Sequence, residues 1–161
     1  MNNAGISSKN HPNDPIMGVD AEELMSILRT NVVGTLTTSQ VFYPLLKGGV
    51  SKIVMNLSSQ LGSIDKCWGM QGRYGGVGCY RMSRAANNMM MRCFGGELRD
   101  EGFTFISMSP GHVNTDMGAA GGRKPPLEVP ESITGMLQVL EGLTREDNGR
   151  FLQYDGSELP W

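Results

Sequence analysis

The chain has 161 residues, the size of one domain, which is long enough to bury an apolar core. Its 14 Lys and Arg against 16 Asp and Glu give a formal net charge of −2, which offers no electrostatic basis for binding nucleic acid or an anionic membrane. Apolar runs are broken every few residues, so no segment is expected to span a bilayer. The opening residues, MNNAG, lack the basic and apolar regions of a secretory signal, and we expect a cytoplasmic protein.

Cysteine and histidine do not indicate a metal or disulfide site. The three cysteines are odd in number and none lies in a CxxC pair, which fits a reducing compartment: Cys67, Cys79 and Cys93. His11 and His112 have no thiol or carboxylate neighbours at the spacing of metal ligands. We therefore expect no bound metal, and we interpret His112 as structural or solvent-facing rather than catalytic.

The first predicted element is a long helix. Residues 1–19 are polar with two prolines and predict a loop. Asp20 is a good N-cap, and Glu23 three residues later completes the pattern of a capping box. Apolar residues then recur at helical spacing, and the helix is expected to end near Lys47, before two consecutive glycines.

Short apolar strands and amphipathic helices alternate through the rest of the chain. Residues 52–58 and 104–109 predict buried strands, and residues 151–154 predict a third, shorter strand. Between them, the i, i+3, i+4, i+7 pattern predicts a helix over 80–98 and another over 131–143. Strands alternating with helices favour right-handed βαβ crossovers, so the fold class is α/β with a parallel sheet.

Two glycine-rich or proline-rich stretches, residues 69–78 and 118–130, are predicted to be loops. The first of them does not follow a strand in the order or spacing of a dinucleotide-binding turn. We interpret it as a flexible loop near the active site. Only three strands are visible in the pattern, so the sheet looks incomplete on its N-terminal side.

A positive charge lies next to a potential proton donor on the second helix. Tyr80 and Arg84 are four residues apart and share one face near the helix N-terminus. A cation about 4 Å away contributes about 4 kcal/mol at an effective dielectric of about 20, which could lower a tyrosine pKa by roughly three units. Alone, the pair is better explained as a surface contact without function.

Several further motifs follow one another in a characteristic order. They are NNAG at residues 2–5, NVVG at 31–34, LSS at 57–59, YRMSR at 80–84 and SPGHVNTDM at 109–117. With this set the sequence resembles a short-chain dehydrogenase/reductase. The YRMS and PGHVNTDMG stretches, with the ending FLQYDG through PW, make it similar to the C-factor and sniffer-type carbonyl reductase group.

The resemblance implies a reaction and a catalytic set. The reaction is NAD(P)(H)-dependent reduction of a small carbonyl compound, or oxidation of an alcohol. Asn31 would anchor a proton-relay water. Ser59 would hydrogen-bond the substrate carbonyl, with Ser58 as the less favoured neighbour. Tyr80 would be the general acid in reduction and the base in oxidation, supported by Arg84.

The same resemblance implies a cofactor site. Asn3 would lie in the turn beside the cofactor, and Thr115 would hold the nicotinamide carboxamide. The full set that it implies for NAD(P) is Asn3, Ala4, Gly5, Tyr80, Arg84, Pro110, Gly111, Val113 and Thr115.

Two departures from the family pattern have consequences. The family motif is YxxxK, and Arg84 replaces its lysine with a planar fork, which brings the contact to the cofactor ribose into question. At about 30 residues per βαβ unit, roughly 80 residues with the phosphate-binding turn would be expected ahead of Asn2. We therefore expect a single partial domain over residues 1–161, the C-terminal part of a Rossmann-type doubly wound sheet, that binds cofactor weakly alone.

Three interpretations remain open. The chain is the catalytic part of an enzyme, or it is a non-enzymatic truncated homologue acting as a C-factor-like signalling or interaction protein. In the third interpretation, Met1 is an internal methionine or a premature start within a longer gene. The triplet Met89, Met90 and Met91 is expected to fill the core or to face a partner. In the family the two helices containing Asn31 and Met89 usually form a subunit interface, which implies a possible homo-oligomer.

Overall fold

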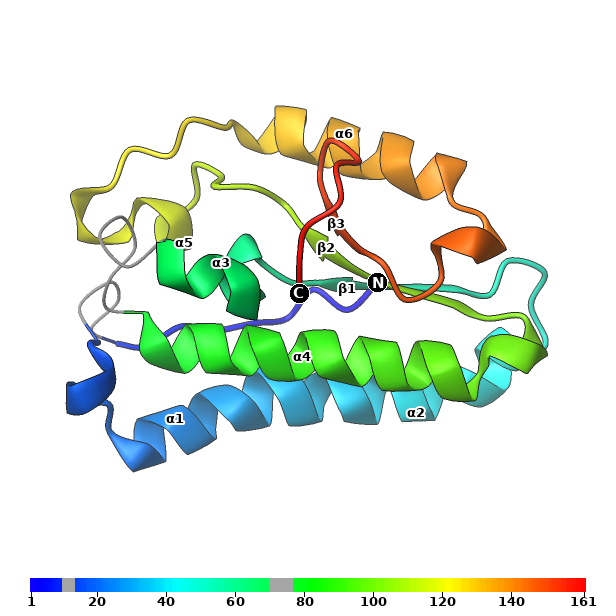
Figure 1. The fold of residues 1–161 in the computed structure, drawn as a ribbon, viewed down its shortest axis with the longest axis horizontal. Helices are drawn as coiled ribbons and strands as arrows, with labels where there is room; N and C mark the ends of the chain where they lie inside the picture. The colour runs from blue at the N-terminus through cyan, green and yellow to red at the C-terminus, as the bar shows by residue number, and fades with distance from the viewer. Residues whose placement is uncertain (10–13, 70–76) are drawn as a thin grey trace.

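Three parallel strands form the centre of the molecule in the order β1-β2-β3 (Figure 1). The computed structural model describes residues 1–9, 14–69 and 77–161. The strands are β1 (Ile53–Leu57), β2 (Thr104–Ser109) and β3 (Phe151–Gln153), and each pairs with the next in parallel register. The predicted α/β class and parallel sheet are therefore confirmed.

The predicted first helix is present as one continuous rod. It consists of α1 (Ala21–Leu28), a π-helical turn η2 (Arg29–Val33) and α2 (Gly34–Lys47). Asp20 caps it as predicted, because its Oδ1 accepts the Glu23 N–H at 2.8 Å. The predicted capping box is nevertheless wrong in its second half. The Glu23 carboxylate accepts the Lys9 N–H at 2.6 Å and so fastens the entering loop.

The helices cover the sheet on two faces. The α1–α2 rod and α4 (Gly78–Glu97) lie side by side on one face, and α6 (Val129–Gly142) covers the other (Figure 1). Each face has its own core. The cluster on the α4 side consists of Val54, Met91, Phe103 and Phe105, and the cluster on the α6 side consists of Met55, Ile106, Met108, Met136 and Leu152.

Short helical turns occupy segments that the sequence predicts as loops. The stretch 118–130 begins within α5 (Asp116–Ala119) and η5 (Ala120–Gly122), so the prediction of a plain loop is wrong there. Seven of the residues predicted as a glycine-rich loop, 70–76, lie outside the described residues. The remaining short elements are η1 (Ile16–Gly18), η3 (Gln60–Gly62), α3 (Ile64–Gly69), η4 (Arg99–Glu101) and η6 (Arg145–Asp147).

The N-terminal segment joins the sheet at a single residue. Asn2 forms a parallel bridge with Asn56: its N–H donates to Met55 O at 2.8 Å, and its carbonyl accepts the Leu57 N–H at 2.9 Å. Its side-chain amide donates to Ser39 Oγ on α2 at 3.1 Å. The residues that follow Asn2 are thereby held at the carboxyl end of β1.

Two adjacent buried asparagines on α4 differ in whether their side-chain amides form hydrogen bonds. Asn88 accepts the Ser58 hydroxyl at 2.7 Å and donates to Gly62 O at 3.4 Å. Asn87 is fully buried, yet neither atom of its amide has a hydrogen-bond partner in the described part of the chain. An unpaired buried amide costs about 1–3 kcal/mol, whereas a paired one does not.

These neighbours provide a matched pair of substitutions. Asn87→Leu is expected to raise the free energy of unfolding by about 1 kcal/mol, because it replaces an unpaired amide with an apolar group of similar size. Asn88→Leu is expected to lower it by about 1–3 kcal/mol, because the buried Ser58 hydroxyl loses its acceptor. Urea denaturation of both variants measures the difference. Equal effects of the two substitutions would contradict this account of the α4 interior.

Candidate functional site

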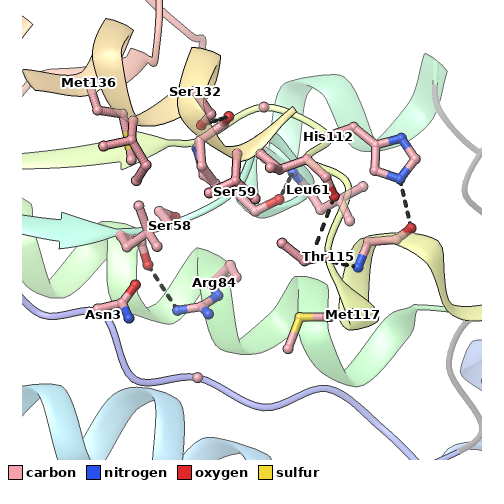
Figure 2. Close-up of a pocket in the computed structure, with 18 of the residues that line it drawn as sticks. Asn3, Ser58, Ser59, Leu61, Arg84, His112, Thr115, Met117, Ser132 and Met136 are labelled. Carbon is pink, nitrogen blue, oxygen red and sulfur yellow. Dashed lines mark hydrogen bonds between the residues drawn. The ribbon is translucent and has the colours of Figure 1, made fainter. Parts of the chain in front are cut away.

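The predicted site residues gather at the carboxyl edge of the sheet. Parallel strands all end at the same edge, and a cavity of about 420 Å³ opens there beyond β1 and β2. Figure 2 shows Ser59, Arg84 and Thr115 around it. Nine of the residues predicted from the sequence line this cavity: Asn3, Gly5, Ser59, Tyr80, Arg84, Pro110, Gly111, Val113 and Thr115. Ala4 and Asn31 are not among the lining residues.

Asn31 acts from behind the cavity as a fully buried link between three segments. It lies in η2, and its Oδ1 accepts the Ile6 N–H at 2.8 Å. Its Nδ2 donates to Ile6 O at 2.9 Å and to Ser83 Oγ at 2.9 Å. Ser83 in turn donates to the Tyr80 carbonyl at 2.8 Å. One amide therefore ties the N-terminal segment and the first turn of α4 to the long helix.

The main-chain carbonyl of Asn31 has a side-chain partner of its own. The Thr35 hydroxyl donates to it at 2.8 Å. The role of Asn31 in a relay stays a prediction, and its structural role is the clamp on Ile6 and Ser83.

The two serines after β1 differ in what their hydroxyls can do. Ser58 is buried and donates its hydroxyl to Asn88 on α4. Ser59 is half-buried and caps η3, where its Oγ accepts the Leu61 N–H at 3.2 Å. That bond uses the oxygen as an acceptor and leaves the O–H of Ser59 to donate toward the cavity. The preference for Ser59 over Ser58 as the residue that holds a substrate carbonyl stays a prediction.

Arg84 lies against the face of the Tyr80 ring. The centre of its guanidinium is 4.9 Å from the ring centroid, which is a cation–π contact. Its Nη1 donates to Leu57 O at 3.0 Å, while its buried Nε has no partner among the described residues. Both side chains are more than nine-tenths buried. The spacing predicted this pair, and the structure shows that the contact goes through the ring face.

Two glycines make room for the arginine. A Cβ on Gly5 would collide with Arg84 Nη2, and a Cβ on Gly62 would lie 2.8 Å from Arg84 Cβ. Leu57 O points to the edge of β1 that Asn2 pairs with. If that pairing continued, a backbone N–H of the N-terminal segment would donate to this oxygen, and the Arg84 guanidinium donates to it instead. The guanidinium therefore ends the pairing between β1 and the N-terminal segment.

The loop after β2 forms the opposite wall. Gly111 has φ +82°, a conformation that side chains disfavour. Thr115 caps α5, and its Oγ1 accepts the Gly118 N–H at 3.1 Å. A His112 ring nitrogen lies 3.0 Å from Gly118 O, which is consistent with the structural role expected for this histidine. Apolar side chains of α6, including Ile133 and Met136, complete the wall.

Comparison with known proteins identifies the family. A family model of short chain dehydrogenases matches residues 1–125. The chain belongs to the short-chain dehydrogenase family. C-signal of Myxococcus xanthus is 37% identical over 161 residues, which is all of this chain and 90% of that protein.

Two solved short-chain dehydrogenase relatives share the fold closely. The NADPH-bound carbonyl reductase from chicken fatty liver superposes with a TM-score of 0.87 at 36% identity. The carbonyl reductase Sniffer of D. melanogaster superposes with a TM-score of 0.85 at 33% identity. Each match covers 99% of this chain and 64% of the other chain. The chain therefore has part of a Rossmann-type fold, as predicted.

Some contributors to this short-chain dehydrogenase site were not predicted. Ser83 connects Asn31 to Tyr80, and Asn88 holds Ser58. Ser83 lies three residues after Tyr80, a helical spacing that hints at contact, but its link to Asn31 spans 52 residues. Met117, the last residue of the SPGHVNTDM stretch, and Met136 also line the cavity.

The titratable groups close to the site do not form a metal-binding cluster or a reactive thiol. Within residues 1–9, 14–69 and 77–161, no group of three or more metal-binding side chains occurs. Cys79 precedes Tyr80, and burial, reinforced by the Asp14 carboxylate, raises the pKa of its thiol. A raised pKa keeps the thiol protonated and unreactive at neutral pH. None of the helices in this part of the chain has the length and apolarity to cross a membrane.

Proposed function

We propose that this chain carries the catalytic site of an NAD(P)(H)-dependent carbonyl reductase, with Tyr80 as the proton donor. One observation carries the proposal: Ser59, Tyr80 and Thr115 come from three separate segments and line one cavity with apolar walls. A small carbonyl compound is the substrate class that suits a cavity of about 420 Å³ with a few polar groups.

The proposed reaction divides into a hydride and a proton. NAD(P)H, when bound, supplies the hydride to the carbonyl carbon. Ser59 donates a hydrogen bond to the carbonyl oxygen, and Tyr80 transfers its phenolic proton to that oxygen as negative charge develops. Asn31 and Ser83 position Tyr80 by fixing the first turn of α4. Arg84 holds the tyrosine ring from one face.

The residues present fit the nicotinamide half of the cofactor. Thr115 and Gly111 line the cavity beside Tyr80, where they would offer polar contacts to the nicotinamide end. None of the three described strands is followed by a glycine-rich turn that leads into a helix N-terminus, which is the usual pyrophosphate site. We therefore expect binding through the nicotinamide end alone and correspondingly weak affinity.

Replacing the proposed proton donor tests the chemistry. At millimolar NADPH with a panel of small aldehydes and ketones, Tyr80→Phe is expected to lower turnover by about 10²–10⁴-fold, because the general acid is lost. Arg84→Lys should preserve or raise turnover, since an ammonium keeps the positive charge beside the ring. NADPH absorbance measures both. Tyr154→Phe, which removes a hydroxyl outside the cavity, is the control, and equal turnover of Tyr80→Phe and the parent would refute the mechanism.

Cofactor affinity tests the expectation of weak binding. Fluorescence titration of the 161-residue chain with NADPH and with NADH is expected to give dissociation constants above about 0.1 mM, because none of the described strands leads into a pyrophosphate-binding turn. Micromolar affinity for either nucleotide would contradict this expectation.

A second candidate function is a signalling or interaction protein without turnover. The observation that favours it is the match to C-signal, which extends over 90% of that protein. Exposed apolar side chains on α2, such as Phe42 and Leu45, and Met89 on α4 offer a surface for a second copy of the chain. Absence of turnover by the parent chain at saturating NADPH, with the fold intact, would favour this function over catalysis.

A further inference from the structure

Two walls of the proposed carbonyl reductase site come from segments that follow different strands. Ser59 comes after β1, and Gly111 comes after β2. In the described part of the chain, the last backbone hydrogen bond between the two segments runs from the Ser58 N–H to Met108 O, at 2.7 Å. Beyond that bond, a link between the two walls has to come from a side chain.

Ser109, the last residue of β2, supplies this link. It is fully buried, and its Oγ accepts the Gln60 N–H at 3.1 Å and the Gly111 N–H at 3.3 Å. A hydroxyl oxygen has two lone pairs, so these two bonds use its full capacity as an acceptor. One buried atom therefore joins the residue after Ser59 to the turn at Gly111.

The turn that Ser109 holds is also fastened to α6. Ser132 is buried on α6, and its hydroxyl donates to Pro110 O at 2.6 Å. Gly111 has φ +82°, and a Cβ there would lie 2.9 Å from Leu127 Cδ2, so this turn has a close-packed conformation. Ser109 therefore connects Gln60 to a part of the site that is itself held in place.

On the other side of the link, the Ser59 hydroxyl follows the position of Gln60. Ser59 is the N-cap of η3, which begins at Gln60, and its Oγ accepts the Leu61 N–H at 3.2 Å. A shift of Gln60 would carry this hydroxyl with it. A displacement of about 1 Å in a group that orients a substrate can cost about 10²-fold in rate.

We propose that Ser109 is a positioning residue for the reaction, because it holds the Ser59 hydroxyl at a fixed distance from the wall at Gly111. Ser109 is not among the residues that line the cavity, so it acts through its two N–H partners rather than on the substrate. The inference rests on the proposed function, in which Ser59 binds the substrate carbonyl.

Hydrogen exchange tests the link itself and does not depend on turnover. Ser109→Ala is expected to accelerate exchange of the Gln60 and Gly111 amides by about tenfold or more, because both lose their acceptor. Ser107, two positions earlier in β2, provides the matched control, since its hydroxyl is equally buried but has no hydrogen-bond partner among the described residues. Ser107→Ala should leave the exchange of both amides unchanged.

Turnover at millimolar NADPH tests the consequence for the reaction. Ser109→Ala should lower kcat by about tenfold, and Ser107→Ala should leave it unchanged. In a Ser59→Ala background, the further loss caused by Ser109→Ala should shrink to about twofold or less, because the hydroxyl that it positions is gone. A purely structural role would lower kcat equally in both backgrounds.

A second variant removes the same hydrogen bond without changing the buried strand. Gln60→Pro deletes the N–H that donates to Ser109. Proline is favoured at the first position of a helix, and the extended backbone of Ser59, with φ −160° and ψ 147°, suits a residue before proline. Gln60→Pro should therefore fold normally and lower kcat to a similar extent as Ser109→Ala.

Unchanged exchange of both amides in folded Ser109→Ala would overturn the proposal. Equal losses from Ser109→Ala in the parent and Ser59→Ala backgrounds would also overturn it, as would parental kcat in Gln60→Pro. Absence of turnover by the parent chain would refute the proposed function and the role of Ser109 in the reaction together. Failure of the exchange or background comparison with an active parent would refute the role of Ser109 alone.

Discussion

The side-chain amide of Asn31 is the interaction on which the site depends. It is fully buried, and its oxygen and both of its N–H groups form hydrogen bonds to two residues, Ile6 and Ser83. A buried amide with complete partners specifies one arrangement, because any displacement leaves a polar group unpaired at a cost of about 1–3 kcal/mol. The π-helical turn that contains Asn31 lies where the rod passes behind the cavity. Through this residue, three elements distant in sequence are held at one end of the sheet.

The environment of Arg84 follows from that arrangement. With the N-terminal segment held against α4, Gly5 lies close to the guanidinium, and any side chain there would collide with it. The arginine then bonds Leu57 O and covers the Tyr80 ring. A lysine would present a compact ammonium in place of the planar guanidinium, which here contacts Leu57 O and the ring face at once. The substitution therefore changes how the tyrosine is held, and it also ends the strand pairing at Asn2.

Local patterns predicted the elements but not their long-range contacts. The strand predicted over residues 104–109 has the same bounds in the structure, where all six of its residues are buried. The Pro-Gly pair that follows it marks its end in the sequence. Helix α5 has four residues, which is too short to show a helical period, and it was missed. The family resemblance implied that Ser59 and Tyr80 act at one site, and both line one cavity. The partners of Asn31 lie 25 and 52 residues away, and no spacing rule reveals them. The Glu23 carboxylate was misassigned because a loop residue competed for it.

Hydrogen exchange of the Ile6 amide in Asn31 variants tests the clamp most directly. In Asn31→Ala this amide loses its acceptor, and its exchange should accelerate by about tenfold or more, while the amide of Ile106 in β2 stays protected. Asn31→Asp retains an oxygen for the Ile6 N–H and should keep much of its protection. Unchanged exchange of Ile6 in folded Asn31→Ala would show that the N-terminal segment is held by other contacts, and would contradict the account.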